Sequence, residues 1–409
     1  MPNKSEPSSG RPLSTGKARR DAPAKTVYHA PASARPRSAS AKTVYHAPAR
    51  QPQRTRQPAA ARPAPRPHSQ PAARPAARPA ARRRSTAGRT AGRLCALAGT
   101  FALFLVVLAA GAGFVFCKGP SPTARDLFVN TMLETSALKF VPRLFLSSGE
   151  VQAIVARNAV VETDETTQVS GEEFEPSSDK PLDTIEIEEV HGSTYQGKMM
   201  IVYDPSRIHL ACLDAFSANG KGKKLAEFVE EAGAVAGINA GGFADENGMG
   251  NGGMPIGLVI QNGKMLAGQA GGSYSVIGLD NTNHLQVGQM TGAEALERGL
   301  RDAVSFGPAF IINGEPVDVT GSGGGLNPRT VMGQREDGAI LLLTIDGRQP
   351  HSLGANYQDC IRVMQEYGAV NASNLDGGSS SQMIYQGETI NVCSSLYGPR
   401  NLPVAWLVQ

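Results

Sequence analysis

The sequence predicts one strand-rich α+β or mixed α/β domain with a mixed or mainly antiparallel sheet and a few helices. A transmembrane helix and a disordered tail should precede it. Short apolar runs bounded by glycine follow one another from about residue 184, whereas runs with helical spacing are few. We expect a disordered tail over 1–93, a membrane helix over 94–117, a stalk and acidic linker over 118–183 and the folded domain over 184–409.

The charge of the 409-residue chain is divided unevenly. Residues 1–93 hold 21 of the 40 Lys and Arg but only two acidic residues. The tail therefore has a net charge of +19. Because the whole chain has a net charge of +4, the rest of the chain has a net charge of −15. Such asymmetry on the two sides of an apolar run indicates regions that face different surroundings.

The uncharged run from Leu94 to Cys117 is long enough to cross a bilayer with some tilt. Arginines cluster before it, so the positive-inside rule places the N-terminus in the cytoplasm and the domain outside, at the cell membrane. A buried core helix and a signal peptide cleaved near Ala110-Gly111-Ala112 are alternatives. A basic leader this long exceeds the roughly 15–30 residues of a secretory signal, so we expect an uncleaved signal-anchor.

The tail is rich in Pro, Ala, Arg and Ser and cannot bury enough apolar area to fold. Its nonapeptide Ala24–Ala32 recurs unchanged as Ala41–Ala49. The repeat is either a docking motif for an unknown partner or a neutral duplication. We expect the basic run to lie on anionic lipids, and we expect no nucleic-acid binding because no folded reader domain is visible.

Several elements of the folded domain can be placed from periodicity. Leu225 to Glu231 and Asn356 to Tyr367 have helical spacing, and each is followed by a glycine. Leu341 to Ile345 and Ala369 to Leu375 are apolar runs of strand length. We expect one compact core of strands with these two helices packed against it.

Polar residues follow the two strands directly. Asp346-Gly347-Arg348 comes after one strand, and Asn374-Leu375-Asp376-Gly377-Gly378-Ser379 overlaps the end of the other. Arg329-Thr330 leads into a further strand, and Asn239 ends the run before Gly241-Gly242. Glycine exposes backbone N–H groups that suit an anion, so these loops predict one site assembled from several strand ends.

Other familiar sites are excluded by their motifs. Gly248 to Gly253 fits G-x-G-x-x-G, but a proline and a strand follow it, which argues against a dinucleotide site. The chain has no Walker-A, H-E-x-x-H or G-x-S-x-G sequence. The histidines lack metal-ligand spacing, and His351 alone is close enough to Asp346 to be considered for the pocket, with a surface loop as its alternative.

The cysteines of the domain do not indicate a metal site. Cys212, Cys360 and Cys393 contain no C-x-x-C pair. One disulfide with a buried thiol and three buried thiols both fit the sequence.

Seven motifs together resemble the phosphodiester glycosidase family over roughly 185–409. They are Gly237-Ile-Asn-Ala-Gly-Gly-Phe243, Phe306-Gly-Pro-Ala309, Arg329-Thr-x-x-Gly333, Asp346-Gly-Arg348, Ser352-x-Gly354, Asn374-Leu-Asp-Gly-Gly-Ser-Ser380 and the strand Val404–Val408 after Arg400. The resemblance implies hydrolysis of a sugar-1-phosphodiester at the anomeric C–O bond, in an envelope glycan or exopolysaccharide.

The implied chemistry assigns roles to the strand-end residues. Asp376 and Asp346 are the candidate catalytic carboxylates, and Arg329 is expected to hold phosphate oxygens in a bidentate fork. The expected substrate-binding residues are Asn239, Asn374, Gly377, Gly378, Ser379, Thr330, Arg348 and His351. We expect no cofactor, although the two carboxylates are also suited to a divalent cation such as Ca²⁺. A non-catalytic module that binds a glycan or phosphate polymer is the alternative function.

Overall fold

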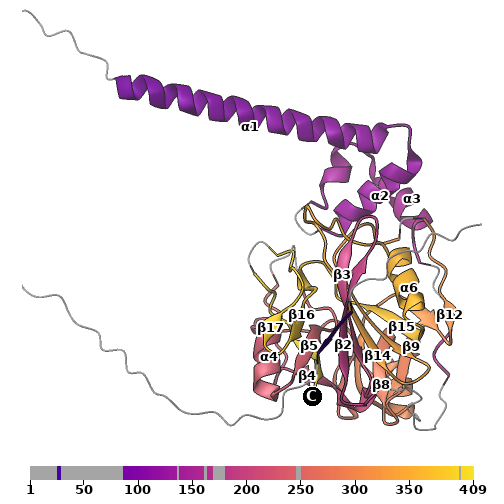
Figure 1. The fold of residues 1–409 in the computed structure, drawn as a ribbon. Helices are drawn as coiled ribbons and strands as arrows, with labels where there is room; N and C mark the ends of the chain where they lie inside the picture. Colours follow the sequence, from indigo (N-terminus) through magenta and orange to yellow (C-terminus); the bar gives the residue numbers. More distant parts are fainter. Residues whose placement is uncertain are drawn as a thin grey trace, which may run out of the picture. The chain divides into compact units, whose positions relative to one another are not determined.

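The computed structural model describes residues 25–28, 86–135, 138–160, 164–168, 180–245, 250–321, 323–395 and 398–409 (Figure 1). Residues 31–108 form one unit, and residues 1–30 with 109–409 form the other. The predicted disorder of the tail and of the acidic linker falls largely outside the described residues.

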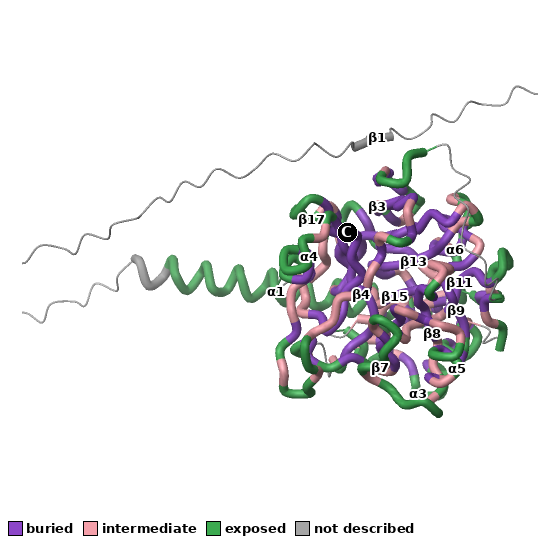
Figure 2. The backbone as a smooth tube through the Cα atoms, turned by 90° about the horizontal axis from the view of Figure 1, so that it is seen from below, coloured by how far each residue is buried: buried purple, intermediate pink, exposed green. Residues whose placement is uncertain are grey.

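Helix α1 (Thr86–Lys118) contains the apolar run. Within Thr90–Lys118 an 18-residue window has a mean hydropathy of 2.4, and the apolar side chains of the helix are mostly exposed (Figure 2). Its length and composition are sufficient to cross a membrane.

The other helical segments are short and lie between or beside strands. They are α2 (Pro122–Leu133), η1 (Val141–Leu144), α3 (Ser148–Arg157), η2 (Pro205–Arg207), α4 (Leu225–Ala232), α5 (Gly292–Glu297), α6 (Tyr357–Glu366) and η4 (Gly378–Ser380).

Three sheets make up the domain. The eight-stranded sheet has the order β1 (Lys25–Tyr28), β2 (Ile185–His191), β3 (Gln196–Val202), β14 (Ile340–Ile345), β13 (Arg329–Arg335), β15 (Ala369–Leu375), β11 (Ala309–Ile312) and β12 (Glu315–Pro316). One five-stranded sheet has the order β7 (Lys264–Ala267), β6 (Val259–Gln261), β10 (Leu300–Ser305), β8 (Ser273–Asp280) and β9 (Leu285–Thr291). The other has the order β17 (Glu388–Thr389), β16 (Met383–Tyr385), β5 (Ala236–Asn239), β18 (Val404–Val408) and β4 (Ile208–Cys212).

The strand-rich α+β fold is confirmed. Every strand pair in the described residues is antiparallel, so the antiparallel alternative holds for the sheets. The predicted helices and strands are present: α4 and α6 each lie within two residues of the expected bounds, and β15 has the expected bounds.

Strand β14 is buried on both faces, which explains why apolar residues follow one another along it without alternation. Leu342 packs among residues of all three sheets, including Ile238, Ile277 and Trp406. Its neighbour Leu341 faces the opposite side of the sheet, where α6 contributes Met364. A strand buried on both faces has no polar side, so its sequence shows a continuous apolar run.

Strand register brings the polar ends of three strands together. Arg329 at the start of β13 lies opposite Ile345, the last residue of β14. Thr330 lies opposite Leu375, the last residue of β15. The loops after β14 and β15 therefore leave the eight-stranded sheet beside the residues that begin β13.

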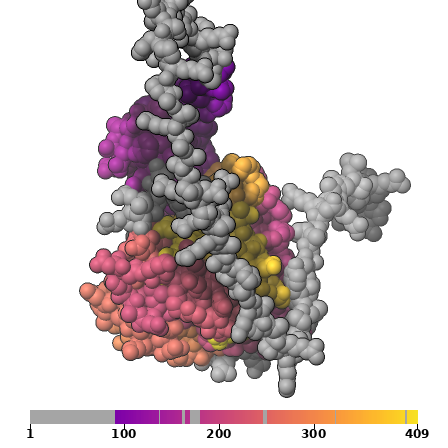
Figure 3. Space-filling view, turned by 90° about the vertical axis from the view of Figure 1, so that its left-hand side faces the viewer, coloured from indigo at the N-terminus to yellow at the C-terminus, as the bar shows by residue number. Residues whose placement is uncertain are grey.

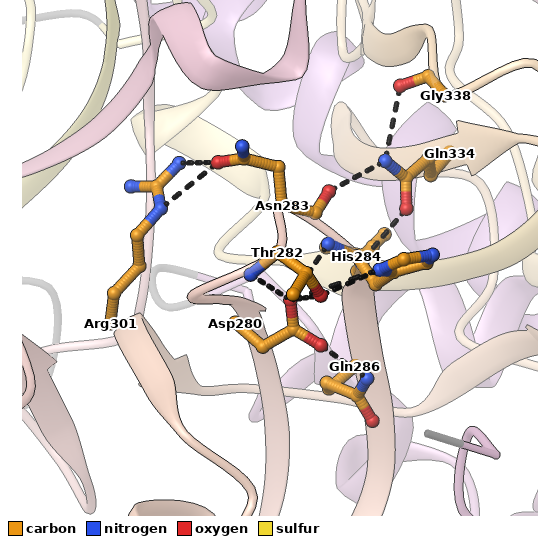
Figure 4. Close-up of polar contacts among 9 residues, drawn as sticks. Asp280, Thr282, Asn283, His284, Gln286, Arg301, Gln334 and Gly338 are labelled. Carbon is orange, nitrogen blue, oxygen red and sulfur yellow. Dashed lines mark hydrogen bonds and ion pairs between the residues drawn. The ribbon is translucent and has the colours of Figure 1, made fainter. Parts of the chain in front are cut away.

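A buried polar network closes the far end of the β8–β9 hairpin (Figure 4). Asp280 accepts hydrogen bonds from Thr282, from the His284 backbone and from Gln286. Gln334 of β13 bonds the same hairpin through the carbonyl of Asn283. Burial lowers the pKa of His284, although the nearby Asp280 charge opposes the shift. The network joins two sheets, and among the described residues Gln286 Oε1 has no hydrogen-bond partner.

Residues 122–157, here called the α2–α3 cap, have a small core of their own and sit against one end of the domain (Figures 1 and 3). The cap touches the loop before β13, where Leu326 N–H donates to the Thr131 hydroxyl. Gly325 has a φ of +60° and approaches Thr131 so closely that a Cβ would lie 2.4 Å from the Thr131 nitrogen. The glycine therefore sets how closely the cap approaches the domain.

Strand β1 lies within the first copy of the tail nonapeptide and pairs with β2, the neighbouring strand at the sheet edge. The tail and the domain must lie on the same side of a membrane for this pairing to form within one chain. An α1 that crosses the membrane separates them. Membrane crossing by α1 and β1–β2 pairing therefore exclude each other in a single molecule.

Substitution of Gly325 tests the docking of the cap. Gly325→Ala is expected to displace α2, whereas Gly314→Ala also has a positive φ but meets no atom within 4 Å. Both variants should lose about 1 kcal/mol from backbone strain. Only Gly325→Ala should also raise the rate of limited proteolysis near Glu134, by about tenfold. Equal cleavage rates for the two variants would contradict this role for Gly325.

Candidate active site

A pocket of about 370 Å³ opens where the strand-end loops meet the cap. Its lining is polar and contains three arginines and three carboxylates. The lining residues are Glu134, Gly242, Phe243, Asp245, Ile256, Phe306, Gly307, Asn327, Arg329, Arg348, Tyr357, Asn374, Asp376, Gly377, Gly378, Ser379, Ser380 and Arg400. Seven of the sequence-predicted site residues therefore line one pocket: Asp376, Arg329, Asn374, Gly377, Gly378, Ser379 and Arg348.

Asp376 is the residue in this pocket with the clearest electrostatic signature. Burial raises the pKa of its carboxyl from 3.8 to about 6, against the lowering effects of the Ser380 hydrogen bond and the Arg400 charge. The charge of Asp245 adds to the rise. A carboxyl with a pKa near 6 can gain and lose a proton close to neutral pH.

Asn239 and Thr330 hold the Asp376 loop from behind the pocket and do not line it. Asn239 Nδ2 donates to the backbone carbonyl of Asp376 at 2.5 Å. Asn239 Oδ1 accepts from the Thr330 hydroxyl at 2.9 Å and from the Gln382 N–H at 3.1 Å. Both side chains are fully buried and neither lines the pocket, and their predicted role in substrate binding stays a prediction.

Asn374 lines the pocket and has one polar side-chain atom without a partner among the described residues. Its Nδ2 donates to the Gly307 carbonyl at 3.0 Å, and its side chain is 2% exposed. Its Oδ1 is buried and has no hydrogen-bond partner among the described residues. A buried acceptor that lines a pocket and lacks a partner is satisfied when a ligand donates to it.

Arg329 is oriented differently from the fork that the sequence predicts. Its guanidinium stacks on Tyr357, 4.5 Å from the ring centre. Nε donates to the Ala355 carbonyl, and Nη2 donates to the carbonyls of Gly324 and Gly325. These bonds use Nε and Nη2, whereas Nη1 lies 4.0 Å from Oε2 of Glu134, which lines the pocket.

Arg348 and Glu134 complete this side of the pocket. Arg348 donates to Asn327 Oδ1 and to the backbone carbonyl of Glu134, and its Nη1 lies beside Gly378. Burial lowers the pKa of Arg348, and the neighbouring Arg329 charge adds to the effect. Glu134 Oε2 lies 4.0 Å from Arg329 Nη1, so a cap carboxylate stands beside two cations that would otherwise attract an anionic ligand.

Asp245 and Arg400 form the ion pair of the opposite wall, and neither was among the predicted site residues. Arg400 Nη2 lies 2.9 Å from Asp245 Oδ1, and its Nη1 also reaches the Ser379 hydroxyl. Burial pushes the pKa of Asp245 upward, but hydrogen bonds from Arg400 and Gly250 hold it below its ordinary value. Asp245 lies two residues after the Gly241-Gly242-Phe243 run, which is the one sequence signal that pointed to it.

Asp346 and His351 lie outside the pocket lining, unlike the sequence prediction. Asp346 Oδ1 accepts from the Val392 N–H at 2.9 Å and from Asn391 Nδ2 at 3.2 Å. His351 Nε2 lies 3.4 Å from Asp346 Oδ2. The carboxylate is thus turned toward the segment after β17 and fixes that segment.

The described residues contain no group of three His, Cys, Asp or Glu side chains arranged to hold a metal. Whether the pocket carboxylates bind Ca²⁺ stays a prediction. The three cysteines of the domain are thiols, and burial raises the pKa of Cys212 and Cys360 to about 12.

Residues 232–409, which include most of the residues that line this pocket, match the family described as Phosphodiester glycosidase. The resemblance to that family is confirmed. Within the matched range lie Asp245, Arg329, Arg348, Asp376 and Arg400, whereas Glu134 of the cap lies outside it.

Two curated proteins align with parts of the chain. The SPbeta prophage-derived uncharacterized protein YomE of Bacillus subtilis is 32% identical over 168 residues, which is 38% of this chain and 25% of that protein. The N-acetylglucosamine-1-phosphodiester alpha-N-acetylglucosaminidase of Mus musculus is 24% identical over 218 residues, which is 48% of this chain and 41% of that protein. The chain thus spans less than half the length of either relative.

The chain also aligns with solved structures at low identity. The zebrafish N-acetylglucosamine-1-phosphodiester alpha-N-acetylglucosaminidase catalytic domain, auto-inhibited by its pro-peptide, aligns at 19% identity with a TM-score of 0.48. The alignment covers 60% of this chain and 87% of the zebrafish chain.

The raised pKa of Asp376 predicts a pH-dependent effect of Asp376→Asn on stability. The folded protein holds the Asp376 proton more tightly than the unfolded chain, because the pKa rises from 3.8 to about 6. This stabilising contribution is present below about pH 4 and is lost as the pH rises through about 6. At pH 8 Asp376→Asn should therefore be more stable than the wild type, by about 1–2 kcal/mol after discounting for solvent in the pocket.

Thermal unfolding of both proteins at pH 4 and pH 8 measures this difference. The advantage of the variant should shrink toward zero at the lower pH. A variant that is less stable at pH 8 would show that the carboxylate is stabilised, not strained, by its surroundings.

Proposed function

We propose that the chain is a membrane-anchored hydrolase that cleaves a sugar-1-phosphodiester of the N-acetylglucosamine-1-phosphate type in an extracytoplasmic glycan. Family membership supports a hydrolase role on phosphodiester-linked sugars. The observation that carries the proposal is the Asp376 carboxyl, with its pKa near 6, in one pocket with Arg329, Arg348 and Arg400. That combination suits a substrate that is both anionic and cleaved with the help of a carboxylate.

The cations of the pocket match a phosphodiester. Nη1 of Arg329 lies beside the Glu134 carboxylate, and Nη1 of Arg348 lies beside Gly378. A phosphodiester oxygen bound between them would take the position that the Glu134 carboxylate now approaches. Backbone N–H groups of the Gly377-Gly378 turn add donors on the same side.

The sugar is expected on the side of Asn374 and Asp376. A sugar hydroxyl that donates to Asn374 Oδ1 would satisfy the buried acceptor that lacks a partner. This contact places the anomeric carbon between the arginines and the Asp376 carboxylate.

The reaction then needs little acid assistance. The bond between the anomeric carbon and the bridging oxygen breaks, and its electron pair leaves with the phosphomonoester. Water attacks the anomeric carbon, and its proton passes to Asp376, which is mostly ionised at pH 7. Asp245 stays ionised beside Arg400 and stabilises the positive charge that develops on the sugar ring.

Hydrolysis by two carboxylate variants tests the proposal and separates an enzyme from a module that only binds. Asp376→Asn should lower kcat for a soluble N-acetylglucosamine-1-phosphodiester by about a hundredfold or more, with KM little changed. Asp346→Asn is the matched control, because that side chain lies outside the pocket and an amide can still accept the Val392 N–H. It should retain turnover within about threefold.

Release of free sugar by the wild type is the primary readout. Binding without release would favour the glycan- or phosphate-polymer-binding alternative. Equal losses in the two variants would return Asp346 to the catalytic pair that the sequence predicts.

The membrane topology has a separate test. Protease added to intact cells should remove the domain after α1 and leave the cytoplasmic tail protected, because the arginine cluster precedes the apolar run that begins at Leu94. Tail and domain that are both protected or both digested would contradict the orientation. That outcome would instead fit β1 paired with β2 in one chain.

A further inference from the structure

The cap exposes apolar side chains around η1. Leu138, Phe140 and Leu144 are 41%, 55% and 67% exposed. Lys139 and Arg143 lie among them, and no acidic residue occurs between Glu134 and Glu150. Exposed apolar side chains interleaved with basic ones and without acidic ones match the chemistry of a lipid–water interface.

This segment is fixed to the end of the apolar helix. The Phe145 ring lies so close to Gly113 of α1 that a Cβ there would be 2.7 Å from the ring. Phe116 of α1 stacks on Phe128 of α2, with ring centres 5.1 Å apart. Cys117 is buried in the same small cluster as the cap residues Val129 and Leu146. The C-terminal turns of α1 and the cap are therefore one packed structure.

The contact at Gly113 sets the depth of the segment. Gly113 lies five residues before Lys118, which is about 7.5 Å along a helix. The interfacial layer on each side of a bilayer is about 5–8 Å thick. The apolar run from Leu94 to Cys117 is about 36 Å long as a helix, which exceeds the hydrocarbon layer by about 6 Å. If the run is centred in the bilayer, Gly113 lies about 3 Å inside the hydrocarbon boundary. Phe145 therefore lies at this boundary, and the adjoining η1 lies next to the interface.

The pocket opens beside the same part of the cap. Glu134 lines the pocket four residues before Leu138. The charge of Lys139 acts on Asp245 at the opposite wall. The loop before β13, which carries Arg329, is bonded to Thr131 of α2. The distance between the pocket mouth and the exposed η1 side chains is thus fixed by the cap.

We propose that residues 138–144 lie in the lipid–water interface of the membrane that α1 enters, so that the pocket opens at the membrane surface. A lipid surface is favoured over a protein partner because the patch adjoins the end of α1 through the contact of Phe145 with Gly113, and because its charged side chains are all basic. If the proposed function also holds, the substrate class is a sugar-1-phosphodiester whose alcohol is a membrane lipid.

Depth-dependent fluorescence quenching tests the interface directly and does not depend on activity. The full chain with Phe140→Trp is placed in phosphatidylcholine and phosphatidylglycerol vesicles whose acyl chains carry bromine near the headgroup. Leu296→Trp on α5 is the matched control, because Leu296 is also exposed, at 38%, and α5 packs on β8 and β9. Trp406 is fully buried and adds the same background to both.

Brominated lipid should lower the added emission of Phe140→Trp about twofold and leave Leu296→Trp unchanged. An unquenched Phe140→Trp would overturn the proposal, and a blue-shifted but unquenched emission would indicate a protein cover instead.

A second measurement tests the substrate class. The double variant Phe140→Ser, Leu144→Ser should raise KM about tenfold for a lipid-linked sugar-1-phosphodiester in vesicles. It should leave kcat and KM for the soluble phosphodiester unchanged, as should the control Leu296→Ser. Equal effects on both substrates would overturn the lipid-linked substrate. If the wild type cleaves neither substrate, the proposed function fails, and the quenching result still decides the interface.

Discussion

The site depends on one buried amide, Asn239, which joins two sheets at the point where the pocket forms. It stands at the end of β5, holds the Asp376 carbonyl with its nitrogen and receives the Thr330 hydroxyl of β13 with its oxygen. Burial of an amide is costly unless its donors and acceptor are used, and the Gln382 N–H supplies a further partner. The loop that carries Asp376 is thereby fixed where burial raises the pKa of its carboxyl.

The ends of the strands were predictable from the sequence because each is marked by an apolar run that stops at a polar residue. A continuous apolar run ending in Asp346 and another ending near Asp376 mark β14 and β15, and antiparallel register brings both ends to the start of β13. The directions of the side chains were not predictable. Asp346 accepts from the Val392 N–H, 46 residues further along the chain. Arg329 donates to the carbonyls of Ala355 and Gly325, and these contacts depend on how the loop before β13 folds back on the side chain.

Three charged pocket residues were not predicted from the sequence, because each is brought to the site by a contact with a distant part of the chain. Asp245 and Arg400 are separated by 155 residues, and each is unremarkable in its own loop until the ion pair brings them together. The sequence predicts that Glu134 lies in a stalk. In the structure, the positive φ of Gly325 lets this segment approach the pocket. One wall of the site is therefore supplied by residues that precede the region matched to the family.

The central claim is that the pocket holds a sugar phosphodiester with its phosphate on the arginines and its anomeric carbon at Asp376. A crystal structure of the protein with a non-cleavable sugar-1-phosphonate tests it most directly. We expect phosphonate oxygens to bind Nη1 of Arg329 and Nη1 of Arg348 and to displace the Glu134 carboxylate. We also expect a sugar hydroxyl to donate a hydrogen bond to Asn374 Oδ1. A ligand bound elsewhere, or one bound here with Glu134 in place and Asn374 Oδ1 still without a partner, would contradict it.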